Sequence, residues 1–91
     1  MHLPRAYQMD SVKPYTVADI AVDIPIGNRV FMISNTGAQP LYINPKVTAT
    51  AANGFLVPAG QVFPQYFSCD ANLSVISNIT GTTVSILYLD V

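Results

Sequence analysis

The sequence predicts an all-β fold, a small antiparallel β-sandwich or a jelly-roll-like barrel with an extended N-terminal arm, from three observations. Short apolar segments alternate with a period of two, which is typical of strands with one face on a core. Turn residues separate about seven such segments at intervals of roughly 8–12 residues, a spacing typical of sandwiches and barrels. No long amphipathic helix is visible, and 91 residues suffice for one domain.

The N-terminal segment, residues 1–14, is expected to be the extended arm, and residues 15–91 the sandwich domain. The arm has no sustained period, and Pro4 and Pro14 each fix φ and remove an amide donor. It also carries apolar side chains that a freely solvated tail normally lacks: Leu3, Tyr7, Met9 and Val12. These side chains pack either on the arm's own domain or on a neighbouring subunit, and the sequence leaves both open.

The first expected strand runs from Tyr15 to Ile24 and ends at Pro25. Its alternation directs one set of residues to the core, namely Thr16, Ala18, Ile20, Val22 and Ile24. Asp19 and Asp23 then share the solvent face.

The next expected strand, Arg29–Ser34, is apolar on both faces, which suits a central strand covered on each side. Asn35-Thr36-Gly37 supplies turn chemistry, because Asn and Gly accept positive φ at little cost. Leu41–Asn44 is a third strand, and we expect it to form a hairpin with residues 30–34.

The second half contains four further segments. Residues 47–54 are small and uncharged and predict a loop or an edge, with a short helix as the less favoured alternative. Phe55–Pro58 predicts a brief strand. Pro64 cannot donate to a β-ladder, so Gln61–Ser68 belongs at a sheet edge or bulge. Two clearer strands, residues 72–78 and 82–90, close the chain; the turn glycines Gly54, Gly60 and Gly81 are each expected to adopt positive φ.

The charge content is unusually low. The chain is 51% hydrophobic and 10% charged, whereas ordinary soluble domains are about 25% charged. Few charges remain to oppose association, so we expect partners to cover part of the surface. The net charge is −1 and the cations are scattered, which argues against nucleic-acid binding: Arg5, Lys13, Arg29 and Lys46.

The residues needed for catalysis are missing. The chain has no Glu, and its one histidine, His2, lies in the expected arm. Asp19 and Asp23 on one strand face would lie roughly 13 Å apart, too far for a carboxylate pair. We therefore predict that the protein is not an enzyme and has no catalytic residues.

No metal or cofactor site is expected either. One Cys and one His cannot build a structural zinc site, and the aspartates lack calcium-loop spacing. A calcium or magnesium ion shared between subunits through Asp70 or Asp90 remains open. Cys69 cannot form an intrachain disulfide, and we expect a small buried side chain there rather than a nucleophile.

Two further features bear on partners. No apolar run has the length of a signal-peptide core or a membrane span, so synthesis in the cytoplasm and no membrane contact are expected. Four aromatic residues gather in one segment and belong either to the core or to an exposed docking patch: Phe55, Phe63, Tyr66 and Phe67.

Three segments carry a resemblance to a known class of proteins. VFMISNTGAQPLYINP, VTATAANGFLVPAGQVFPQYFS and LSVISNITGTTVSILYLD resemble, in that order, small virion proteins of tailed bacteriophages. The resemblance runs from Val30 to Val91 and leaves Met1–Pro14 outside. It implies a structural protein of the capsid exterior, or a small accessory of the head–tail or tail-fibre apparatus, without catalytic residues.

Composition, arm and resemblance together predict a capsid decoration or cement protein. Such a protein would bind the major capsid protein on the outer surface of the virion, form a homo-oligomer (dimer or trimer) and stabilise the shell. The alternative is a tail or head–tail accessory module that binds carbohydrate or a receptor, with edge aromatics stacking on sugars.

Overall fold

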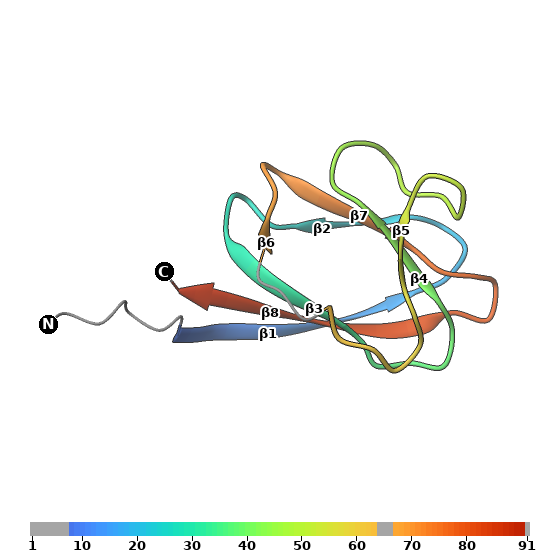
Figure 1. Cartoon of the computed structure of the whole chain (residues 1–91), viewed down its shortest axis with the longest axis horizontal. Coiled ribbons are helices and arrows are strands. Elements are labelled where there is room, and N and C mark those ends of the chain that lie inside the picture. Colours follow the sequence, from blue (N-terminus) through green and yellow to red (C-terminus); the bar gives the residue numbers. More distant parts are fainter. Residues whose placement is uncertain (1–7, 64–66, 91) are drawn as a thin grey trace, which may run out of the picture.

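A computed structural model describes residues 8–63 and 67–90, which form two four-stranded antiparallel β-sheets (Figure 1). The all-β fold is therefore confirmed, and the described residues contain no helix. The strands are β1 (Gln8–Val17), β2 (Val22–Pro25), β3 (Val30–Asn35), β4 (Leu41–Asn44), β5 (Phe55–Val57), β6 (Phe67–Ser68), β7 (Asn72–Ile76) and β8 (Thr82–Asp90).

The order of the strands identifies the topology. Sheet A has the order β1-β8-β3-β6 and sheet B the order β2-β7-β4-β5. The antiparallel pairs β1–β8, β2–β7, β3–β6 and β4–β5 together describe one long hairpin with its turn between β4 and β5. This hairpin is rolled up so that its strands divide between two sheets, which is the jelly-roll arrangement.

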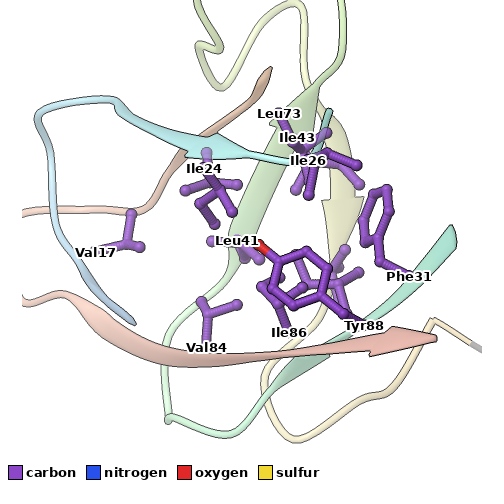
Figure 2. Packing of buried hydrophobic residues seen from close by; sticks show 13 residues of the cluster. Val17, Ile24, Ile26, Phe31, Leu41, Ile43, Leu73, Val84, Ile86 and Tyr88 are labelled. Carbon is purple, nitrogen blue, oxygen red and sulfur yellow. The ribbon is translucent and has the colours of Figure 1, made fainter. Parts of the chain in front are cut away.

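The core lies between the two sheets. Sheet A contributes Phe31 and Ile33 from β3 and Val84, Ile86 and Tyr88 from β8. Opposite them stand side chains of sheet B and its flanking residues: Ile24, Ile26, Leu41, Ile43, Leu73 and Val75 (Figure 2). Because burial of a Leu or Ile side chain stabilises a fold by about 1.5–3 kcal/mol, this apolar layer is what holds the sheets together.

The N-terminal boundary differs from the expected one. Residues 8–14 belong to β1 and pair with β8, so the expected boundary at Pro14 lies inside a strand. Pro14 is tolerated because β1 is an edge strand, whose outer side needs no amide donor. The first part of the expected arm, with Leu3 and Tyr7, lies outside the described residues.

The expected strand from Tyr15 to Ile24 is also wrong in part. The chain leaves sheet A after Val17 and enters sheet B at Val22, so residues 18–21 connect two sheets. Val17 and Ile24 are fully buried, whereas Ile20 is 79% exposed. Ala18 and Ile20 continue the two-residue period of the flanking strands, but they belong to neither β1 nor β2. The sequence pattern therefore does not reveal the break between the two strands.

The expected hairpin between residues 30–34 and 41–44 does not form, because β3 and β4 lie in different sheets. The turn after β3 was expected to use positive φ at Asn35 or Gly37, but neither residue adopts it. In the described residues, positive φ occurs at Gly27, Asn28, Gly60 and Gly81. Gly54, too, lacks the positive φ expected of it. A Cβ on Gly37 would collide with the Thr82 side chain, so close packing is the reason for glycine there.

A buried amide links the two sheets where the chain passes from β3 to β4. The Asn35 side chain is fully buried and accepts a hydrogen bond from the Thr82 hydroxyl of β8 at 2.7 Å. Its Nδ2 donates to the carbonyls of Gln39, at 2.8 Å, and of Val57 in β5, at 3.0 Å. Its Oδ1 also accepts from the amide of Gly37. All the hydrogen-bonding groups of the side chain are therefore used.

We predict that Asn35→Leu lowers the free energy of unfolding by about 2–4 kcal/mol, because the buried Val57 carbonyl and Thr82 hydroxyl lose a partner. Urea denaturation measures the loss. Asn72→Leu, at an exposed strand position, is the matched control and should change stability by less than about 0.5 kcal/mol. An Asn35→Leu protein as stable as this control would contradict the role given to the amide.

The buried Tyr88 closes the other end of the core. Its hydroxyl donates to the Pro25 carbonyl at 3.0 Å, and the Arg29 guanidinium lies 3.8 Å from the ring centroid. Arg29 is held there by hydrogen bonds to the carbonyls of Ile26 and Pro25. Burial, with a smaller contribution from Tyr15, raises the pKa of Tyr88 to about 12.

This raised pKa predicts alkaline destabilisation. Tyr88 ionises near pH 10 in the unfolded chain but only near pH 12 in the folded one. Its contribution is complete below pH 10 and falls by up to about 1.4 kcal/mol per pH unit above it. Denaturation at several pH values should show a shallower decline for Tyr88→Phe than for the wild type. Parallel curves would contradict the assignment.

Candidate interaction surface

The outward side of sheet A is an apolar surface that the pairing registers define. Phe31 pairs with Tyr88 and Ile33 with Ile86 on the core side, so the alternate residues of both strands point outward. We call this surface the outer face; its members on β1, β8 and β3 are Val12, Pro14, Thr16, Thr83, Ser85, Leu87, Leu89, Val30, Met32 and Ser34. Leu89, which lies opposite Val30, is the buried member of this set.

The outer face is ordered in rows across the sheet. Val12, Leu87 and Met32 lie opposite one another in an apolar row, whereas Pro14, Ser85 and Ser34 form the next row. A row of hydroxyls follows, in which Thr16 pairs with Thr83 and the Thr83 hydroxyl lies 2.9 Å from that of Thr36. The outer face is thus apolar at one end and neutral and polar at the other.

None of the outer-face residues is charged. On β1 the charged residues are Asp10, at the β-bulge between Met9 and Ser11, and Lys13, which pairs with Ile86 and points to the opposite side. Val12 is 55% exposed, and Val30, Met32 and Leu87 are half-buried. The apolar row of Val12, Leu87 and Met32 is therefore only partly covered by the described residues. Large exposed apolar patches are unusual on monomeric proteins and often mark a contact site.

The outward side of sheet B combines an apolar row, formed by Leu56, Tyr42 and Ile76, with a polar end. It carries Asp23, Asn44 and Asn72, which help line a polar depression of about 490 Å³ under residues 45–48. The Ser74 hydroxyl there is buried and accepts a hydrogen bond from the Ala49 amide at 2.9 Å. The loop after β4 therefore covers part of sheet B.

A second apolar surface lies where the two sheets meet at one edge. Residues 61–63 run along β3, with the Phe63 amide donating to the Ile33 carbonyl and Val62 opposite Ser34. With β5 they enclose a groove of about 360 Å³, which we call the edge groove; it is lined by Phe55, Leu56, Val57, Pro58, Gln61, Val62 and Phe63.

The aromatic cluster divides at this groove. Phe63 is half-buried against the core, whereas Phe55 is 60% exposed. Their rings meet edge to face with centroids 5.5 Å apart. Tyr66 and the side chain of Phe67 lie outside those described. The sequence left two alternatives for these aromatic residues. Phe63 belongs to the core, whereas Phe55 belongs to an exposed patch.

The other residues considered for chemistry do not converge. Asp19 lies in the connection after β1 and Asp23 on β2, so they do not share a strand face. Asp70 forms an exposed ion pair with Lys46 at 3.5 Å, and exposed pairs of this kind contribute little stability. Among residues 8–63 and 67–90, no three His, Cys, Asp or Glu side chains are placed to hold a metal ion. His2, Arg5 and the Asp90 side chain lie outside those described.

Cys69 is half-buried rather than fully buried, and it packs against the core. Burial, and then the neighbouring Asp70 carboxylate, raises the pKa of the Cys69 thiol. The thiol is therefore protonated at neutral pH, which makes it a poor nucleophile.

The described part of the chain has no apolar helix of membrane-spanning length. The chain matches no known protein family, curated protein or solved structure.

Sequence reasoning did not find the outer face, although the signal was there. Residues 30–34 and 84–89 are apolar at nearly every position. That pattern predicts a strand covered on both sides, but sheet B covers only one side. The excess of apolar residues over what one core face needs could have indicated an interaction surface.

The groove predicts different costs for its two aromatic residues. Phe63→Ala should lower the free energy of unfolding by about 1–3 kcal/mol because its ring packs on the core. Phe55→Ala should cost less than about 1 kcal/mol because most of that ring is exposed. Denaturation of the two variants tests this; a Phe55→Ala loss equal to that of Phe63→Ala would make Phe55 a core residue.

Proposed function

We propose that this chain is a capsid decoration protein of a tailed bacteriophage. It binds the major capsid protein on the outer surface of the virion and stabilises the shell. The three segments between Val30 and Val91 that resemble small phage virion proteins support this function.

The fold is compatible with the proposal and does not decide it. Jelly rolls occur in viral capsid domains, but also in lectins and in cupins. Because one fold serves many functions, the argument has to come from the surface.

The observation that carries the proposal is an apolar, uncharged surface that continues from the outer face to the edge groove. Val62 connects the two, because it lies opposite the outer-face residue Ser34 and lines the groove. In this proposal the groove receives apolar side chains of the major capsid protein. Each contact is weak, but it is repeated at every binding site of the shell. Because the protein would bind the assembled shell and not its separate subunits, binding stabilises the assembled state by mass action.

The alternative of a carbohydrate-binding module fits the geometry less well. Sugar sites combine an aromatic platform with amides or carboxylates that fix hydroxyl groups. Here the exposed ring of Phe55 lines the edge groove, where Gln61 is the one amide side chain in the lining, while Asp23, Asn44 and Asn72 line the polar depression on sheet B. The two sets of lining residues have no member in common.

The abundance of the protein in virions tests the proposal. Quantitative mass spectrometry of purified particles should give about one copy, or one oligomer, per few major capsid subunits. A handful of copies per particle would instead assign the protein to the tail or the head–tail junction. Absence from the particles would overturn a virion function altogether.

A binding assay tests the groove itself. Leu56 is 47% exposed at the groove, so Leu56→Lys should leave the fold intact and weaken binding to capsids that lack the protein by at least tenfold. Ile79→Lys, at an exposed position after β7, makes the same kind of change away from the groove and should bind normally. Equal binding of both variants in a sedimentation assay would exclude the groove as the contact.

A further inference from the structure

We propose that the outer face of sheet A is the interface of a homodimer, in which two copies of this chain pack face to face about a two-fold axis. The inference rests on the proposed function, because a decoration protein is expected to form a homo-oligomer, and it names the surface and the number of copies. Its test uses the purified protein alone, so it can fail or succeed separately from capsid binding.

The apolar row is the centre of this interface. Val12, Leu87 and Met32 lie side by side on three adjacent strands and are all accessible in the single chain. Packing against the same row of a second copy removes this surface from water and gives a four-layer assembly, with neighbouring sheets about 10 Å apart. The hydroxyls of Ser34, Ser85 and Thr83 border the row and can be satisfied by one another or by water.

The lack of charge favours a second copy as the occupant. In a two-fold interface the same patch meets itself, so a charge near the axis lies close to its own counterpart and repels it. The outer face has no charged member. The outward side of sheet B, with Asp23, would meet such repulsion. Homodimer interfaces are also more apolar than contacts between different proteins.

Association through the edge of sheet A is opposed by the sequence of β1. The bulge at Asp10 interrupts the ladder, and Pro14 offers no amide to an added strand. Both features are devices that protect edge strands from pairing. The face, rather than the edge, is therefore the surface through which sheet A meets a second copy.

The outer face has the size of a small interface. β1 and β8 contain 10 and 9 residues, which correspond to about 30 Å at roughly 3.3 Å per residue. The three strands of the outer face, spaced about 4.8 Å apart, make a width of about 14 Å, hence a projected area of roughly 430 Å². This projection is about half of the ~800 Å² per partner of standard interfaces, so the face corresponds to a small interface.

The test compares lysine substitutions by light scattering coupled to size exclusion and by sedimentation equilibrium. The wild-type protein should have twice the chain mass of 9.8 kDa. Met32→Lys should weaken dimerisation at least ~100-fold and elute as a monomer, because the interface would then hold two ammonium groups with no carboxylate to pair with them. Val12→Lys, on the edge strand, is a second variant with little risk to the fold and should behave in the same way.

Two controls with the same change of charge should remain dimeric: Ile79→Lys, in the loop after β7, and Leu56→Lys, in the edge groove. Circular dichroism and thermal unfolding establish that each variant is folded. A monomeric or trimeric wild-type protein would overturn the inference, since packing of a face on itself allows two copies only. Folded Met32→Lys and Val12→Lys proteins that remain dimers would overturn it as well.

Discussion

The structure depends on one buried polar interaction, the hydrogen bonds of the Asn35 amide. Asn35 ends β3, and its side chain joins Thr82 of β8 to the Val57 carbonyl of β5. It therefore connects sheet A with sheet B at the point where the rolled hairpin passes from one to the other. Apolar contacts in the core have little direction, whereas this amide accepts only one relative position of the three strands. The close approach of Gly37 to Thr82 follows from the same arrangement.

With the sheets held in this way, sheet A is apolar on two faces but covered on one. Phe31 and Ile33 enter the core while Met32 and Val30 point outward, because alternate residues of a strand face opposite sides. Met32 and Leu87 are half-exposed, so the single chain gains only part of the stabilisation that full burial of these side chains would give. Their presence, together with the absence of charge, is the physical reason for treating the outer face as an interface.

Local pattern predicted the positions of strands well and their partners poorly. The expected strand Leu41–Asn44 and the last strand, residues 82–90, agree with β4 and β8. A period of two shows which residues share a face but not which strand lies alongside, and in this fold β8 pairs with β1 and β3 rather than with β7. The expected boundary at Pro14 was wrong for a related reason, since an edge strand tolerates proline and β1 continues through it. The edge groove could be foreseen only as a cluster of aromatics, because its walls come from β5 and residues 61–63 of different sheets.

The two proposed contacts support each other physically. Val62 lies beside the outer face and also lines the edge groove, so a face-to-face dimer would carry two grooves on one rigid body. A groove of this size gives only a weak contact by itself. When one groove of such a dimer is occupied, the second is held near its own site at a high effective concentration, provided that the spacing matches. Weak apolar contacts then suffice for stable attachment to a repeating lattice such as a capsid. A surface almost without charge suits this arrangement, because neither the dimer contact nor the lattice contact has to desolvate unpaired ions.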